Sequence, residues 1–240
     1  MSDRTKDSVY QDYFANRGVT SAGDEGFRLP AYLRRILPAD RGAKILDIGC
    51  GLGSMLLALR DLGYHSLQGV DVSAEAVETS RARGLDVVRI DDLDGYCRAG
   101  TERFELVLMS HVLEHLDKAR TIGILRLIRE RLLAPGAALV VVVPNAQSAT
   151  GCYWAYEDFT HHTLFTAGSL QFVLRSAGFR SVEFLDPEAV ADSSPPVRWI
   201  RRALLLLYRA NLAFWNRVTG SAFHRASPRI FSFEIKILAR

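Results

Sequence analysis

The fold is decided by the eight residues Asp47–Ser54, read as DIGCGLGS, which follow the apolar run AKIL. Three glycines at alternate positions after a buried strand predict a turn that a ligand can approach closely. A nucleoside-triphosphate loop would end in GK followed by a hydroxyl residue, but this loop ends in GSM. A dinucleotide loop has the spacing GxGxxG, whereas the spacing here is GxGxG, with the acid Asp47 before it. Because a carboxylate repels phosphate, we expect a positively charged ligand without a phosphate at this point.

Further acids follow the next two strand candidates. Asp71 ends the run LQGVD, at the distance from the loop where a carboxylate can accept both hydroxyls of a ribose. Asp91 and Asp92 follow the third strand candidate, where a carboxylate can receive an adenine amino group. A ribose, an adenine and a cationic tail without phosphate are the parts of S-adenosylmethionine, which we therefore expect as the ligand.

Apolar runs of strand length alternate with helical patterns, which predicts an α/β protein with a doubly wound, mainly parallel sheet. Helices are expected at about 54–62, 74–83 and 119–133, and a further one after a cap at Thr166, ending at Gly178. Residues 145–166 lack a regular period and are interpreted as an irregular active-site segment. The strand candidates read AKILDI, SLQGVDV, LDVVRI, FELVLMS, AALVVVVP, RSVEFLD and RIFSFEIKILAR.

Four of these motifs, ILDIGCGLGSMLLALRDLGY, GVDVS, FELVLMSHVLEHLDK and PGAALVVVVPN, resemble in their order the class I S-adenosylmethionine-dependent methyltransferases. The resemblance covers roughly 42–184. It implies a seven-stranded Rossmann-like sheet with the last strand antiparallel, in a single domain over 1–240. Within that domain we expect an N-terminal helical cap over 1–40 and a basic amphipathic helical insertion over 187–228, between strands 6 and 7.

The same resemblance implies a set of cofactor-binding residues. Tyr10 and Tyr13 can fold over the cofactor, although a tyrosine pair that docks an N-terminal helix on the core is an equal alternative. The remaining implied cofactor residues run from the glycine loop to the end of the fourth strand: Asp47, Gly49, Cys50, Gly51, Gly53, Asp71, Val72, either Asp91 or Asp92, and Ser110.

Methyl transfer to a hydroxyl needs alignment of the nucleophile and a base for its proton, for which histidine is suited at neutral pH. His111 follows the fourth strand, at the edge where open α/β sheets bind ligands. His161 and His162 lie in the segment EDFTHHTLFT, where Asp158 can orient one of them as the base. Alternatively, the two histidines close this loop by hydrogen bonds to the backbone. No metal site is predicted, because the acids and histidines lack a firm ligand spacing.

Charge is distributed unevenly along the chain. From Pro195 to the end there are nine Lys or Arg and one acid, although the net charge of the whole chain is only +3. This pattern favours a local anionic partner and argues against a general nucleic-acid surface. The basic amphipathic stretch over 196–218 suits a membrane surface, but packing on the sheet or on a second subunit in a homodimer is favoured over it, because such stripes most often bury against protein. Three scattered cysteines and a polar N-terminus predict a cytoplasmic location. If the basic stretch binds lipid, we expect contact with the inner face of the membrane.

The leading functional hypothesis is an S-adenosylmethionine-dependent O-methyltransferase that acts on a sugar hydroxyl of a surface-glycan or glycolipid precursor. The run HH…FT…SL…AGF is similar to one found in methyltransferases of bacterial surface saccharides and small metabolites. An alternative acceptor is a small aromatic or quinone-like lipid, which an apolar pocket would favour. From another class, the chain can be an adenosine-ligand-binding protein without catalysis. A nicotinamide-binding oxidoreductase is disfavoured by the loop spacing and by Asp47.

Overall fold

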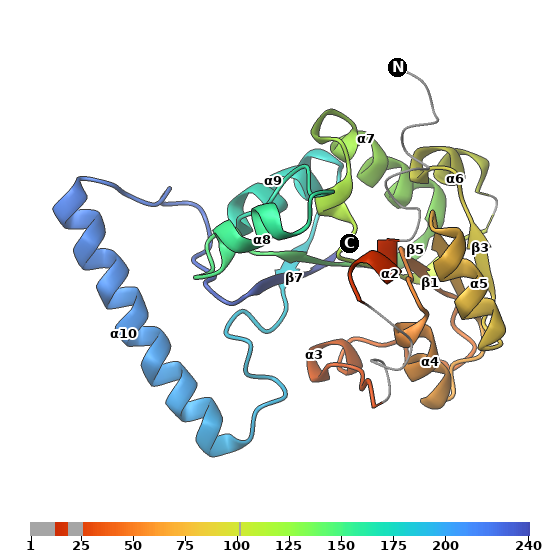
Figure 1. Ribbon diagram of the computed structural model, residues 1–240, viewed down its shortest axis with the longest axis horizontal. Helices are drawn as coiled ribbons and strands as arrows, with labels where there is room; N and C mark the ends of the chain where they lie inside the picture. The colour runs from red at the N-terminus through yellow and green to blue at the C-terminus, as the bar shows by residue number, and fades with distance from the viewer. Residues whose placement is uncertain (1–12, 19–25, 101) are drawn as a thin grey trace.

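The computed structural model describes residues 13–18, 26–100 and 102–240, and seven strands of this part form one sheet (Figure 1). Their order in space is β3-β2-β1-β4-β5-β7-β6. The strands are β1 (Ile45–Ile48), β2 (Leu67–Asp71), β3 (Val87–Arg89), β4 (Phe104–Ser110), β5 (Leu133–Pro144), β6 (Val182–Phe184) and β7 (Glu234–Ala239).

The sheet has one point where the strand order reverses. β1 pairs in parallel with both β2 and β4, so the chain winds outward in both directions from β1. β3 and β5 continue the parallel part, whereas β7 runs antiparallel to both β5 and β6. The predicted doubly wound sheet with an antiparallel last strand is therefore confirmed. Open α/β sheets bind ligands beside the carboxyl ends of the strands at such a reversal.

Helices cover both faces of the sheet, because successive strand residues point to opposite sides. On one face α6, α7 and α9 bury apolar side chains against β4, β5 and β7. On the other face α3 and α4 pack against β1, β4 and β5, and α5 packs on α4 and β3. The helices of this body are α2 (Tyr13–Asn16), α3 (Ala31–Arg34), α4 (Ser54–Asp61), α5 (Ala74–Ala82), α6 (Leu93–Ala99), α7 (Lys118–Leu127), α8 (Gly151–Glu157) and α9 (Ala167–Ser176).

Several helix predictions hold and others need correction. α4, α5 and α9 lie where expected, and Thr166 caps α9 by accepting a hydrogen bond from the Ser169 N–H. The helix expected over 119–133 ends at Leu127, and a wider π-helical turn over Ile128–Leu132 leads into β5. Two short helices are additional to the prediction. One is α6, and the other is α8, which lies inside the segment expected to be irregular.

A long helix, α10 (Pro195–Thr219), connects β6 and β7 and stands apart from the rest of the molecule (Figure 1). Prolines open it, where their missing N–H groups cost nothing, and Gly220 ends it with a left-handed φ of 67°. None of its residues is buried. Among the described residues, no helix combines the length and the apolarity that a membrane crossing requires.

Candidate functional site

The glycine loop lies between β1 and α4, at the carboxyl edge of the sheet. Gly49, Gly51 and Gly53 all have positive φ, of 68°, 52° and 84°. A Cβ on Gly49 would lie 2.3 Å from Cγ2 of Val112, so only glycine fits there. The loop is held from β2, because the Gly51 N–H donates to Oδ2 of Asp71 at 2.9 Å. The spacing in the sequence thus corresponds to a compact turn with an accessible backbone.

Asp47 is a buried carboxylate at the end of β1, with 3% of its surface exposed. No described residue donates a hydrogen bond to it or forms an ion pair with it. Burial, and secondarily the nearby charge of Asp71, raise the pKa of Asp47 to about 7. An unpartnered buried carboxylate is costly, and a cationic group placed beside it would remove most of that cost. The structure thus fits the positively charged ligand predicted from the loop.

Asp71 ends β2 and is 8% exposed. Its Oδ1 accepts the Ser73 N–H at 2.8 Å, while Oδ2 accepts the Gly51 N–H. Burial raises the pKa of Asp71, and these backbone hydrogen bonds act in the opposite direction. The side chain therefore shapes the loop, and each carboxylate oxygen keeps a lone pair for a ligand hydroxyl. Val72 follows it and packs on the core.

The two adjacent acids after β3 have different surroundings. Asp92 caps α6, where its Oδ1 accepts the Gly95 N–H at 2.9 Å, and Nη2 of Arg120 lies 3.6 Å from the same oxygen. Asp91 is exposed and makes no hydrogen bond or ion pair with a described residue. The structure thus gives Asp92 a structural role and leaves Asp91 as the side chain available for an adenine amino group.

The short helix α2 lies over the glycine loop. The ring of Phe14 lies 3.4 Å from where a Cβ on Gly51 would be. The Tyr13 hydroxyl donates to Oδ2 of Asp158 at 2.6 Å, and Nη1 of Arg17 lies 2.6 Å from the same oxygen. The predicted site residues Tyr13 and Asp158 are thus in contact with each other. Tyr10 lies outside the described residues.

Asp158 is engaged on both carboxylate oxygens. Its Oδ1 accepts hydrogen bonds from the backbone N–H of Thr160 at 3.0 Å and from the Thr160 hydroxyl at 2.5 Å. Burial acts to raise the pKa of Asp158, but the bonds from Thr160 and Tyr13 prevail and lower it to about 2. His161 Nε2 lies 3.8 Å from Oδ2. The role of Asp158 as the group that orients a base stays a prediction.

The candidate histidines are separated by the fold. His161 is almost fully buried at its side chain, and its Nδ1 lies 2.7 Å from the carbonyl oxygen of Trp154. His162, the next residue, is exposed. His111 lies at the end of β4 with a φ of 55°, and its Nε2 lies 2.9 Å from Oε1 of Glu234. Of the three histidines, His111 lines the pocket beside Ser110, which is described below.

Glu114 forms the centre of a buried cluster beneath His111. Its carboxylate is fully buried, lies 3.3 Å from Nδ1 of His111, and accepts no hydrogen bond within the described residues. Among the described residues, ligand atoms of Glu114, His115 and His161 lie within 4.8 Å of one another, close enough for one metal ion to contact all three. We interpret it as an ion-pair cluster, because the His111 imidazolium already matches the charge of Glu114. The ring of His115 lies 4.7 Å from that of His161, and burial lowers the pKa of His115.

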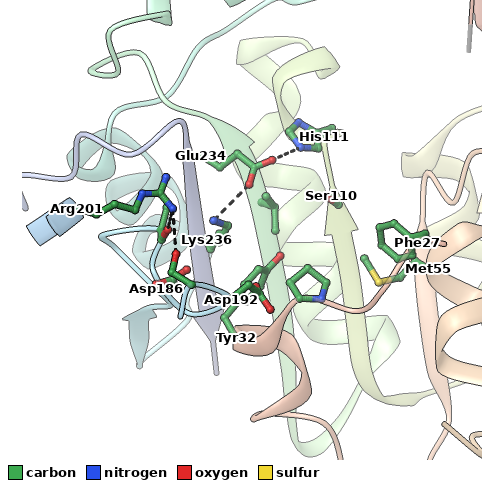
Figure 2. A pocket seen from close by; sticks show the side chains of 14 residues that line it. Phe27, Tyr32, Met55, Ser110, His111, Asp186, Asp192, Arg201, Glu234 and Lys236 are labelled. Carbon is green, nitrogen blue, oxygen red and sulfur yellow. Dashed lines mark hydrogen bonds and ion pairs between the residues drawn. The ribbon is translucent and has the colours of Figure 1, made fainter. Parts of the chain in front are cut away.

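A pocket of about 570 Å³ opens beside Ser110 and His111 (Figure 2). Burial acts to lower the pKa of His111, but the carboxylates of Glu114 and Glu234 outweigh it and raise the pKa to about 9. Lys236 Nζ lies 3.4 Å from Oε2 of Glu234 and 5.1 Å from the centre of the Tyr32 ring. Most of the lining is polar or charged: Tyr32, Ser110, His111, Asp186, Asp192, Ser193, Arg201, Glu234 and Lys236, beside Phe27, Pro30, Met55, Val142 and Ala189.

Of the residues that line this pocket, only Ser110 and His111 are among the site residues predicted from the sequence, and those missed include Tyr32, Glu234 and Lys236. A signal was present for two of them, because Glu234 and Lys236 are charged residues two apart in a strand that is otherwise apolar. Residues two apart point to the same face of a strand, so both charges had to lie together on one side of the sheet. Nothing in the pattern around Tyr32 indicated its position.

Comparison with known proteins gives the class of the fold. Residues 25–183 match the family model described as a methyltransferase domain, and the chain therefore belongs to that family. A solved structure of an S-adenosylmethionine-dependent methyltransferase from Archaeoglobus fulgidus superposes with a TM-score of 0.62 at 25% identity. The superposition covers 87% of this chain and 91% of that one.

Two curated relatives match this chain over only part of their own length. The bifunctional methionine biosynthesis protein MetXA/MetW of Rhodopirellula baltica is 30% identical over 118 residues, which is 46% of this chain and 18% of that protein. The mitochondrial ubiquinone biosynthesis O-methyltransferase of Candida albicans is 28% identical over 128 residues, 49% of this chain and 38% of that protein. The chain thus spans less than half the length of these two relatives.

The chain is an S-adenosylmethionine-dependent methyltransferase domain, and its site fits that cofactor. The sulfonium and ammonium groups of S-adenosylmethionine supply the positive charge that the unpartnered Asp47 carboxylate lacks. The glycine loop leaves no space for a side chain at Gly49, and Asp71 presents carboxylate oxygens at the next strand end. These residues would hold the cofactor at the carboxyl ends of β1 and β2.

Proposed function

We propose that the chain transfers a methyl group from S-adenosylmethionine to a sugar hydroxyl of a surface-glycan or glycolipid precursor. The observation that carries this proposal is the set of polar and charged side chains on one side of the pocket beside Ser110 (Figure 2). Sugars present many hydroxyls, and a site with several carboxylates and cations can pair with them. A site for a purely apolar acceptor would not be expected to carry the charged pair of Glu234 and Lys236.

In the proposed reaction, bound S-adenosylmethionine supplies a methyl group that is already activated by its positive sulfur. The residues of this chain then have to bind the acceptor, align its hydroxyl and remove the hydroxyl proton. Asp47 and Asp71 hold the methyl donor at the end of the sheet. In this proposal the acceptor side is formed by His111 and Glu234, which line the pocket after the end of β4 and at the start of β7.

The proton would pass to the pair formed by His111 and Glu234. With its pKa near 9, His111 carries a proton at neutral pH, so the pair is an imidazolium beside a carboxylate. The Glu234 carboxylate is a poor proton acceptor in this state. Burial acts to raise the pKa of Glu234, but its hydrogen bond to His111 outweighs burial, so the pKa lies below its ordinary value. The pair therefore accepts a proton from the substrate only after His111 has lost its own.

The experiment that tests the proposal uses methyl-labelled S-adenosylmethionine and mass spectrometry. The chain is incubated separately with a membrane glycolipid extract, with nucleotide-activated sugars and with a quinol that lacks its methyl ether. We expect label in a sugar O-methyl group and S-adenosylhomocysteine in equal amount. Label confined to the quinol would contradict the sugar acceptor. Binding of S-adenosylmethionine without turnover of any of the three would favour a non-catalytic binder.

A quinone-like lipid remains the second candidate acceptor. Two observations favour it: the similarity to a ubiquinone biosynthesis O-methyltransferase, and the apolar side of the pocket. Phe27 and Met55 lie together on that side, across from Glu234 (Figure 2). An aromatic ring could rest on these two side chains while its hydroxyl pointed toward His111. The labelled-methyl assay above distinguishes this acceptor from a sugar.

A further inference from the structure

The helix α10 presents an uncovered apolar face along its whole length. The residues of this outer face are half or more exposed, although they are large and apolar. Spaced at 100° per residue, they form a stripe on the side of the helix that points away from the sheet. The outer face consists of Trp199, Ile200, Leu204, Leu206, Leu207, Phe214 and Val218.

The opposite, inner face fixes how the helix is oriented. Nη1 of Arg201 donates to the carbonyl oxygen of Ala189 at 2.6 Å, and Nε of Arg202 lies 2.8 Å from a carboxylate oxygen of Glu188. Further along, the ring of Tyr208 contacts that of Phe231 edge to face. These contacts on one side hold the helix against the loops that precede it and follow it. The outer face is therefore presented to the surroundings by the structure.

The charge of α10 indicates what covers that face. The helix contains five arginines and no acid. By the same helical spacing Arg217 lies on the outer face, in the same direction as Trp199, whereas Arg202 lies at the edge of the inner face, where it pairs with Glu188. A second copy of the helix would bring another five arginines and no carboxylate, so it offers no charge partner. The phosphate groups of an anionic bilayer do, and tryptophans such as Trp199 and Trp215 favour the interface between headgroups and acyl chains.

We propose that the outer face of α10 docks this chain on an anionic lipid surface. The helix would lie in the plane of the interface, with Leu207 and Phe214 among the acyl chains and Arg217 at the level of the phosphates. Since Arg201 lines the pocket from the inner face of the same helix, docking would also place the pocket beside the lipid surface (Figure 2).

Vesicle flotation of the full chain tests the proposal without any methyl acceptor, so its outcome is separate from that of the proposed reaction. The probes are vesicles of phosphatidylglycerol mixed with phosphatidylcholine, and vesicles of phosphatidylcholine alone. We expect binding to the anionic vesicles that weakens as salt is added, and much weaker binding to the neutral ones. No binding to either kind would overturn the proposal.

Variants assign the binding to the outer face. Leu207→Glu combined with Phe214→Glu should weaken vesicle binding by more than about tenfold, because two buried apolar anchors are lost. Arg217→Gln should weaken it about fivefold. Phe172→Glu is the matched control, because Phe172 is 65% exposed and belongs to α9 and not to α10, so this variant should leave binding unchanged. Circular dichroism establishes that each variant is folded.

Two results would contradict the assignment. If the double variant floats as well as the wild type, the outer face is not the docking surface. If light scattering shows a dimer that the double variant loses, and anionic vesicles do not bind the wild type, the face pairs with a second copy.

Discussion

At the scale of single residues, Asp47 couples stability to ligand binding. The carboxylate is buried and has no partner among the residues that the structure describes, so the free protein carries a cost that a bound cation would remove. Because its pKa is about 7 in the folded chain and 3.8 ordinarily, folding favours the protonated form. The cost is absent below pH 3.8, grows as the pH rises through this window, and is complete above about pH 7.

We therefore predict that Asp47→Asn stabilises the ligand-free chain by about 2–4 kcal/mol at pH 8 and by much less at pH 4. The same substitution should weaken binding of S-adenosylmethionine, because the ligand loses its counter-charge. Urea unfolding at both pH values measures the first effect, and calorimetry measures the second. An equal stability difference at the two pH values would show that ionisation of Asp47 is not the cause.

His111 gives a second prediction, on the pH dependence of turnover. Since the pair with Glu234 accepts a proton only after His111 has lost one, kcat/KM should rise about tenfold per pH unit and level off near pH 9. His111→Gln should lower kcat by roughly a hundredfold or more and remove this slope, while cofactor affinity stays constant. A wild-type profile that is flat from pH 6 to pH 9 would exclude His111 as the titrating group.

The sequence predicts the position of a candidate site residue well when that residue follows a strand, and poorly when it lies in a loop. Asp47, Asp71, Ser110 and His111 all lie at the expected edge because each directly follows an apolar run. His161 and His162 are adjacent in sequence, yet one is buried and the other exposed, and no period in that segment indicates which. Asp91 and Asp92 could have been separated, because Asp92 stands three residues before Gly95, the spacing of a helix cap.

At the scale of elements, the glycine loop is defined by its conformation and by the space around it. Gly49→Ala would place a Cβ in a left-handed residue and 2.3 Å from a methyl of the stiff side chain Val112. We predict a loss of about 2–4 kcal/mol in the free energy of unfolding. Gly63→Ala is the control, because φ is 90° there and nothing lies within 4 Å of the added carbon.

Gly63→Ala should therefore cost only about 1 kcal/mol, which is the conformational part alone. Chemical denaturation of both variants gives the difference. Equal losses would mean that Val112 moves aside without cost and that the loop is less closely packed than described.

Element predictions were reliable for long periodic segments and failed for short ones. Helices α4, α5, α9 and α10 have clear apolar spacing or caps, and their bounds were close to those observed. The seven-residue helices α6 and α8 are too short to show a period, and α8 is built largely from aromatic residues that also suit loops. The turn over Ile128–Leu132 departs from the 3.6-residue period of an α-helix. The apolar spacing of the sequence could not indicate this departure, because it is compatible with one continuous helix.

At the scale of the whole molecule, the sheet brings distant parts of the chain to one edge. β1 and β2 supply the cofactor side, and β4 and β7 supply the pocket. β7 inserts between β5 and the edge strand β6 only after α10, so the segment that makes the proposed lipid surface also delivers Glu234 and Lys236 to the site. The fold class followed from the order of strands and helices, and the seven-stranded topology followed from the resemblance to class I methyltransferases. The pocket could not be predicted in this way, because it depends on side-chain packing between segments far apart in the sequence.

The most direct test of the central claim is a calorimetric titration of the full chain at pH 8 with S-adenosylmethionine and, separately, with NAD. The account predicts one site for S-adenosylmethionine, with affinity reduced in Asp47→Asn, and no detectable binding of NAD. Binding of NAD at that site, or no heat with S-adenosylmethionine, would contradict it.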